Sequence, residues 1–395
     1  MEATGVSQRS CFCQMPEYAL LRINRPLHWF ALLTALCTFL LLGAGGLVTS
    51  HEAGMSVPDW PNSYGYNMFL FPPSRWVGGI FYEHTHRLIA SGVGLMTTIL
   101  AVWLWLKDSR KWMHWVGTAA FLLVVAQGVL GGLRVVLADA QLGIFHAILG
   151  QLFFVLTSAI ALFTSRFWKR LENIEHLTSN IQHPMTGCRP NVEKIDVGCS
   201  MLDVRCLFLR RLVLSTTILI FCQLIIGATM RQQHAGLAIP DFPLAYGKIW
   251  PDTGATAVQG YNEVRMNVIA ENPITAFQII LQMTHRLVAL AISILTATCA
   301  WQAWRRLGKK DPLTKLALSW LGLILAQALL GAATIWSNKA ADVATAHVLG
   351  GALSLVTGAL WCVIGFRRSA ALPEFAPVTT ISGAYGGAPA LAANK

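Results

Sequence analysis

The clearest chemistry in this sequence lies in four histidines that recur as two pairs. His86 and His146 lie in the first half of the chain, and His285 and His347 lie in the second half. Each histidine opens a long uncharged run, so each pair would place two imidazoles at one depth of a helical bundle. Two facing imidazoles can hold a haem iron from both sides. Zinc or copper binding and simple burial of hydrogen-bonded histidines are the alternatives.

A carboxylate accompanies only the first pair. Glu83 precedes His86 by three residues and shares its helix face, whereas Gln282 occupies the matching place before His285. A carboxylate in apolar surroundings can perform acid–base chemistry, and glutamine keeps the shape without titrating. We therefore predict that Glu83 is catalytic and that the first half is reactive, while the second half holds a cofactor.

An arginine directly follows one histidine of each pair. Arg87 follows His86, and Arg286 follows His285. Because the guanidinium fork matches a carboxylate, we predict that both arginines contact haem propionates. Anchoring of a helix end at the membrane interface would equally account for them.

Long apolar segments must position these residues. The chain has 395 residues, of which 54% are hydrophobic and only 12% are charged. Each apolar run lies near the ~20 residues that a helix needs to cross a bilayer. The sequence therefore predicts an all-α integral membrane protein with eight transmembrane helices. The expected spans are 26–50, 88–106, 112–133, 142–165, 212–230, 287–304, 316–338 and 343–366.

The sequence repeats itself in order. HEAGMSVPDWP at 51–61 matches QHAGLAIPDFP at 233–243, and THRL at 85–88 matches 284–287. AQGVLGG at 126–132 matches AQALLGA at 326–332, and an insertion in the second long outer loop explains the change of offset. We predict two tandem four-helix bundles in parallel orientation. The expected divisions are an N-terminal segment 1–27, a bundle 28–165, a linker 166–210, a bundle 211–366, and a tail 367–395.

Basic residues indicate the orientation. Most of the 30 lysines and arginines fall at the termini and in the even-numbered connections, so both termini are expected in the cytoplasm. This bias accounts for the net charge of +11 without a nucleic-acid partner, and the lipid bilayer is the expected counterpart. The lack of an Arg-rich presequence favours the bacterial cytoplasmic membrane over the mitochondrial inner membrane.

The remaining histidines and the cysteines receive structural interpretations. None of the nine cysteines lies in the long outer loops, and Cys11 with Cys13 cannot complete a zinc site alone. His84 points to another helix face than His86, so we expect it at the helix entrance rather than on the iron. His51 and His234 are expected at the surface.

Taken together, these motifs resemble the haem A synthase family. The similarity extends from about residue 28 to 366. It includes the eight spans in two halves, E-x-x-H-R at Glu83–Arg87, THRL at 284–287, the later histidine of each half, and the Pro-Asp-aromatic-Pro loops. The resemblance implies oxidation of the C8 methyl group of haem O to the formyl group of haem A, through a hydroxylated intermediate.

The resemblance also implies roles for individual residues. His285 and His347 would bind a permanent haem b, His86 and His146 would surround the substrate haem, and Glu83 would be essential. Haem O would come from a haem O synthase; the electron donor and homo-oligomerisation stay open. The rival functions are a di-haem b, quinol-linked electron carrier and a haem-handling chaperone or transporter.

Overall fold

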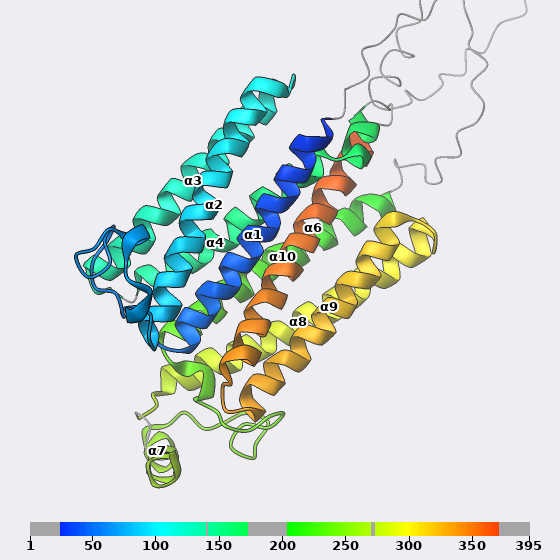
Figure 1. Cartoon of the computed structure of the whole chain (residues 1–395). Helices are drawn as coiled ribbons and strands as arrows, with labels where there is room; N and C mark the ends of the chain where they lie inside the picture. Colours follow the sequence, from blue (N-terminus) through cyan, green and yellow to red (C-terminus); the bar gives the residue numbers. More distant parts are fainter. Residues whose placement is uncertain (1–23, 140, 173–203, 270–272, 371–395) are drawn as a thin grey trace, which may run out of the picture.

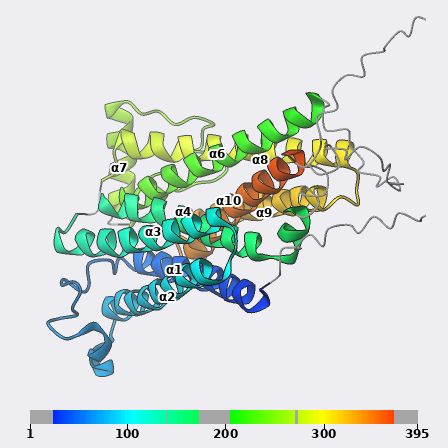
Figure 2. The same cartoon turned by 90° about the horizontal axis from the view of Figure 1, so that it is seen from above.

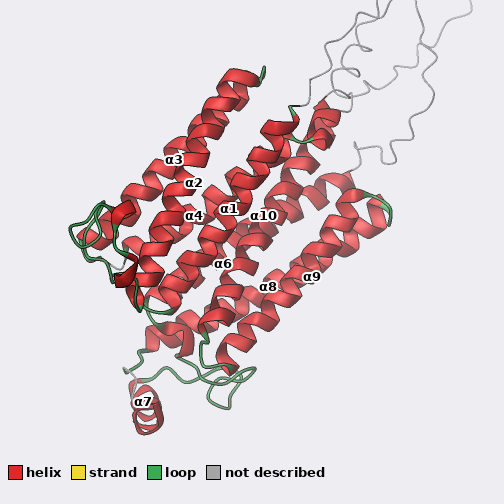
Figure 3. Cartoon of the chain, in the orientation of Figure 1, coloured by secondary structure: helices red, strands yellow, loops and turns green. Residues whose placement is uncertain are grey.

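The described part of the chain is helical. The computed structural model describes residues 24–139, 141–172, 204–269 and 273–370, and within these ranges only two isolated bridges interrupt helices and loops (Figure 3). Eight helices there are long and apolar enough to cross a membrane, which confirms the predicted all-α membrane architecture. They are α1 (Arg25–Ser50), α2 (Gly79–Lys107), α3 (Lys111–Val136), α4 (Leu142–Thr164), α6 (Val204–Gln232), α8 (Ala276–Leu307), α9 (Pro312–Trp336) and α10 (Ala341–Ala370).

Local sequence signals fix where several helices begin. Asn24 accepts a hydrogen bond from the Leu27 amide at the start of α1, and Asp311 caps α9 in the same way. Thr275 and Gln278 form a capping box at α8. These side chains satisfy amide groups that have no partner within the helix, so each start is stabilised by about 1 kcal/mol.

The helices pack as two groups of four that share a seam. α1 packs against α2 and α4, and α3 lies between α2 and α4; α6 packs against α8 and α10, and α9 lies between α8 and α10. α1 and α4 contact α10, and α4 also contacts α6, so these four helices form the middle of the molecule (Figures 1 and 2). Phe154, Ala352 and Val356 are buried along this seam.

The connections that bear the sequence repeat gather at one end of the bundle, called here the loop end. This end carries the short helices η1 (Met68–Leu70), η2 (Pro73–Arg75) and η3 (Ala235–Leu237) and the helix α7 (Ala255–Ile269). α7 lies at the loop end (Figure 1), where Val258 and Tyr261 pack against a buried cluster that includes Ile279 and Met283 of α8. It occupies the second long loop, where the sequence predicts an insertion. The start of α1 and the end of α10 lie at the opposite end, called the terminal end (Figure 1).

Four expected spans are more than five residues shorter than the helices that contain them. The expected starts at 88 and 287 correspond to helices that begin at Gly79 and Ala276, so His86 and His285 lie about two turns inside α2 and α8 rather than opening them. α6 and α10 likewise extend past the uncharged runs. For α2 and α8 the reason is that buried polar side chains, Glu83 and Gln282 among them, continue the helix beyond its uncharged core.

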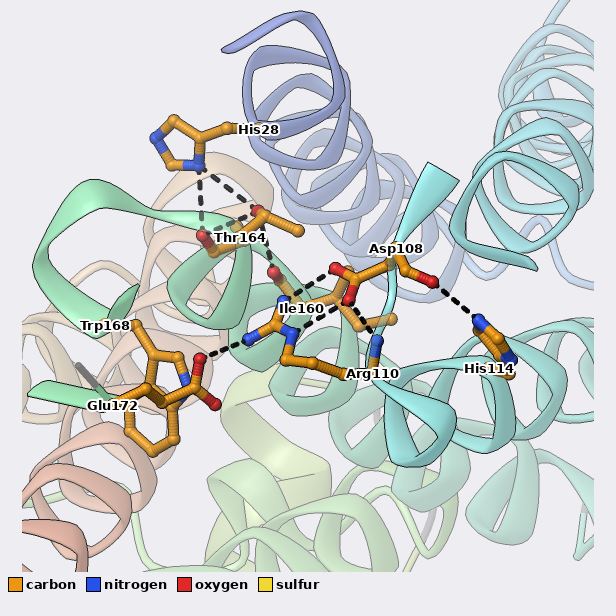
Figure 4. Close-up of polar contacts among 9 residues, drawn as sticks. His28, Asp108, Arg110, His114, Ile160, Thr164, Trp168 and Glu172 are labelled. Carbon is orange, nitrogen blue, oxygen red and sulfur yellow. Dashed lines mark hydrogen bonds and ion pairs between the residues drawn. The ribbon is translucent and has the colours of Figure 1, made fainter. Parts of the chain in front are cut away.

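A buried ionic cluster closes the terminal end of the first group. Arg110 binds Asp108 through two nitrogens, at 2.8 and 2.7 Å, and Glu172 through a third at 2.9 Å (Figure 4). The Trp168 indole donates to the other oxygen of Glu172. Residues 166–172 are therefore helical and packed on the bundle, whereas the sequence predicts a linker from 166 onward. The remainder of that linker up to 203, most of the N-terminal segment 1–27, Cys11 and Cys13, and most of the tail 367–395 lie outside the described residues.

Candidate functional site

The four predicted iron ligands all lie toward the loop end of long helices. His86 is on α2, His146 on α4, His285 on α8 and His347 on α10. The rings of His285 and His347 approach each other edge to face, with their centroids 6.4 Å apart and their planes at 61°. His86 and His146 lie within electrostatic range of each other. The structure thus brings together the members of both predicted pairs.

A glycine on the preceding helix faces each of these imidazoles. A Cβ atom on any of the four glycines would stand 3.0 to 3.3 Å from Cε1 of its histidine, so a side chain there would force the imidazole to shift by a few tenths of an ångström. All four lie in the last two turns of their helices, which sets the histidines at matching depths. The pairs are Gly45 with His86, Gly131 with His146, Gly227 with His285, and Gly331 with His347.

Three of these glycines follow a glutamine by one helical turn, and each glutamine forms a hydrogen bond with the backbone of the corresponding histidine. Its amide donates to the carbonyl oxygen of the histidine residue, at 3.2 Å for Gln127 and His146, 2.9 Å for Gln223 and His285, and 2.6 Å for Gln327 and His347. Leu41 holds the matching place before Gly45 and makes no such bond. Sequence reasoning missed both the glycines and the glutamines, although the repeated AQGVLGG and AQALLGA contain two of each.

The histidine pairs suit a haem. A metal–imidazole bond of about 2 Å on each side of one ion places the ring centres about 6 Å apart, near the 6.4 Å between His285 and His347. Nδ1 of all four histidines is buried without a hydrogen-bond partner. Within the described residues no group of three His, Cys, Asp or Glu side chains could hold a metal ion. A bare zinc ion takes three or four protein ligands, whereas a haem iron needs only the two imidazoles.

Glu83 and Gln282 make the same contact with a repeated loop. Glu83 is 4% exposed, and its Oε2 accepts from the Val57 amide at 2.8 Å. Gln282 is 2% exposed, and its Oε1 accepts from the Ile239 amide at 2.7 Å. The other oxygen of Glu83 pairs with Arg87 at 2.9 Å, whereas the Gln282 amide donates to the Ile239 carbonyl at 3.3 Å. Both side chains therefore hold the segment before the Pro-Asp turn.

Arg87 and Arg286 bind the carbonyl groups of these loops. Arg87 donates to the carbonyls of Val57 and Asp59, each at 2.7 Å, and to that of Asn62 at 3.1 Å. Arg286 donates to the carbonyl of Asp241 at 2.7 Å and to that of Leu244 at 2.9 Å. The two arginines predicted to meet propionates thus have a loop-anchoring role in the structure.

The Pro-Asp turns carry a second repeated set of bonds. The Asp59 carboxylate accepts from the amides of Tyr64 and Gly65, and Asp241 does the same with Tyr246 and Gly247. Burial disfavours the Asp59 charge, but the amides of Gly65 and Tyr64 outweigh it and lower the pKa of Asp59. Gly65 and Gly247 have φ of 77° and 74°, a left-handed conformation that glycine adopts readily. The signal is a shared Tyr-Gly after the turn, which sequence reasoning missed.

His84 is buried away from the histidine pair. Its Nδ1 lies 3.2 Å from the Ser63 hydroxyl, and its ring packs between Phe71 and Trp76. It lies in the second turn of α2 and ties the first long loop to this helix. His51 and His234 are on exposed segments of the loop end.

Comparisons with known proteins agree with this architecture. A family model described as COX15-CtaA, cytochrome oxidase assembly protein, matches residues 28–359. Proteins named "Heme A synthase" are similar over most of the chain. The one from Geobacillus kaustophilus is 25% identical over 329 residues, covering 82% of this chain and 87% of the relative. The one from Rhizorhabdus wittichii is 24% identical over 377 residues, covering 88% and 95% respectively.

A third relative of the same name, from Shewanella oneidensis, is 23% identical over 356 residues, covering 84% of this chain and 94% of its own. The family match includes all eight long helices, both histidine pairs and both repeated loops. The chain therefore belongs to the COX15-CtaA family of cytochrome oxidase assembly proteins.

Proposed function

We propose that this protein is a haem A synthase, which oxidises the C8 methyl group of haem O to the formyl group of haem A. The observation that carries the proposal is the pair of histidine sites on one repeated scaffold, of which only one has a carboxylate beside it. Family membership and relatives named "Heme A synthase" support the assignment. An electron carrier with two equivalent haems would have no use for this difference between the halves.

The second half is the proposed site of a resident haem b. His285 and His347 would hold its iron, and the 6.4 Å separation of their ring centroids supports this. The haem would supply one-electron chemistry when bound. The glycines and glutamines keep both imidazoles at one depth and orientation.

The first half is the proposed site of the substrate haem, between His86 and His146. Glu83 is one helical turn from His86 and would hold or move a proton during oxidation of the methyl group. Its ion pair with Arg87 and the Val57 amide hold the carboxylate in place. Arg87 and Arg286 would act mainly through the loops that they bind, with any propionate contact additional.

The matched contacts of the two halves support the proposed tandem duplication. The predicted bundles 28–165 and 211–366 correspond to the two groups of packed helices. We further propose the bacterial cytoplasmic membrane as the location, with both termini in the cytoplasm and the histidine sites toward the outer side. The charge distribution of the sequence supports this orientation.

Analysis of the haem bound to the purified protein tests the function. Extraction followed by chromatography and mass analysis should find haem b together with haem O, its hydroxylated form or haem A. The His146→Ala variant should keep haem b and lose the oxidised products. Two equivalents of haem b in the wild type, with no oxidised haem, would instead identify an electron carrier.

A further inference from the structure

One half-buried arginine near the first histidine pair has no assigned partner. Arg134 lies on α3 at the loop end, and its Nε is buried without a hydrogen-bond acceptor. Its side chain makes no hydrogen bond or ion pair with any residue in the described ranges. A guanidinium group has five N–H donors, and a partly buried one without acceptors calls for an explanation.

Two glycine contacts place this guanidinium beside His146. Gly131 lies one turn before Arg134 on α3, and its Cβ would stand 3.1 Å from Cε1 of His146. Gly143 lies one turn before His146 on α4, and its Cβ would stand 3.1 Å from Nε of Arg134. Residues one turn apart share a helix face, so the guanidinium lies one turn beyond the imidazole, toward the loop end.

The first repeated loop covers the other side of this guanidinium. A Cβ atom on Gly54 would stand only 2.5 Å from Nη2 of Arg134, so a side chain at this position would occupy the space that the guanidinium group fills. Glu83 and His86 lie within electrostatic range of Arg134. The Glu83 oxygens bind Arg87 and the Val57 amide, and no hydrogen bond joins Glu83 to Arg134, so Glu83 does not supply the missing acceptor.

The second half has its arginine on the other glycine-bearing helix. Thr334 holds the place that matches Arg134, and its hydroxyl bonds to the backbone of its own helix. Arg231 lies one turn beyond Gly227 on α6, and its Nη2 donates to the Gly46 carbonyl and the Ser50 hydroxyl. Arg231 thus joins the two halves, while Arg134 keeps its donors available.

A porphyrin substrate presents an acceptor that suits this group. Its propionate carboxylates are planar anions, and arginine binds such groups through two parallel hydrogen bonds. We infer that Arg134 binds a propionate carboxylate of the porphyrin held between His86 and His146. This inference rests on the proposed function, and it adds a substrate-positioning residue to it. Arg87 is the weaker candidate because its terminal nitrogens already have backbone acceptors.

Binding of two porphyrins tests the inference. Iron protoporphyrin IX and its dimethyl ester, in which both carboxylates are esterified, are titrated into the full chain in detergent and followed by absorbance. The His146→Ala variant identifies the component that belongs to the first half. The wild type should bind the free acid about 10-fold or more tightly than the ester, as expected for a charge-assisted pair.

The Arg134→Gln variant should bind the acid only as tightly as the wild type binds the ester, with ester binding unchanged. Arg134→Lys should keep part of the preference. Arg75→Gln removes the same charge from an exposed arginine of the first loop and should match the wild type. Circular dichroism and thermal unfolding of each variant control for loss of folding.

Three results would overturn the inference. Equal binding of acid and ester by the wild type would mean that the arginine meets another anion, such as a lipid phosphate. Equal weakening of both porphyrins in Arg134→Gln would assign the arginine to packing alone. A wild type with no component dependent on His146 would overturn the proposed function itself, and this inference with it.

Discussion

The Glu83→Gln variant should retain the fold and lose the oxidation of haem. The second half of the protein supports this expectation, because Gln282 already makes the matching contact there. Its Oε1 accepts from the Ile239 amide as Glu83 accepts from the Val57 amide. The substitution therefore removes the titrating group while leaving the loop an equivalent anchor.

The structure gives the size of the expected loss of stability. Arg87 loses one charged partner but keeps three backbone carbonyl acceptors. The new amide can donate to the Val57 carbonyl, as Gln282 does to the Ile239 carbonyl. A bond to a charged group contributes about 1.5–3 kcal/mol, and partial replacement leaves a net loss of about 1 kcal/mol.

Truncation at the same position should be more damaging. Glu83→Ala leaves the Val57 amide buried without an acceptor and removes the counter-ion of a guanidinium whose side chain is only 10% exposed. Breaking a buried pair by removing one partner costs about 3–5 kcal/mol. Thermal unfolding should thus rank the wild type, Glu83→Gln and Glu83→Ala in that order, with the glutamine variant close to the wild type.

The assay combines this ranking with chromatography of the extracted haem. Glu83→Gln should contain haem b and haem O but neither hydroxylated haem nor haem A, whereas the reciprocal Gln282→Glu variant should still form oxidised haem. Wild-type amounts of haem A in Glu83→Gln, together with their loss in Glu83→Ala, would refute the proton-handling role and leave Glu83 as a loop anchor. A glutamine variant as unstable as the alanine variant would refute the equivalence of the two halves.

Three further predictions concern helix packing and the ionic cluster. Gly331→Ala should push His347 by a few tenths of an ångström, and this should lower the amount of bound haem b or shift its absorbance bands. Gly322→Ala is the control on the same helix: a Cβ atom there meets nothing within 4 Å, so the absorbance spectrum should be unchanged. Glu172→Gln should destabilise the protein by about 3 kcal/mol because it leaves the buried charge of Arg110 partly unpaired, which chemical or thermal unfolding can measure. Burial opposes the charge of Asp108, but its bonds to Arg110 outweigh this effect and hold the pKa of Asp108 below the usual 3.8. The contribution of Asp108 to the free energy of unfolding is therefore complete above pH 3.8 and should disappear as the pH falls through the lowered pKa.

Periodicity and repeats predict the fold well because lipid imposes a simple rule on the sequence. A spanning helix must be apolar for about 20 residues, and eight such runs are visible without any structure. The rule fails at helix ends, where polar residues such as Glu83 and Gln282 are buried by a loop rather than exposed to water. The expected starts of α2 and α8 therefore lie about ten residues too late, because loop packing is not encoded in local hydropathy.

The histidine pairs could be predicted from the sequence, but the glycines and glutamines that position the histidines could not. A histidine in an apolar run stands out by its type, whereas glycines such as Gly131 and Gly331 are common in membrane helices. Their role depends on which neighbouring helix they face, and this is a property of packing. The roles of Arg87 and Arg286 were hidden for the same reason, since the sequence shows the charge but not the carbonyl groups that receive it.

The two halves share a scaffold and differ where the substrate chemistry would take place. The arginines that bind the loops, the aspartates of the Pro-Asp turns and the glycines that face the histidines are matched between the halves. They cannot by themselves give the halves different functions. The differences are single side chains on that scaffold: Glu83 against Gln282, and Arg134 against Thr334. A carboxylate held in place and an arginine with available donors both belong to the first half. One framework can thus retain a haem in one half and position a haem for oxidation in the other, with the distinction made by a few side chains at equal depth.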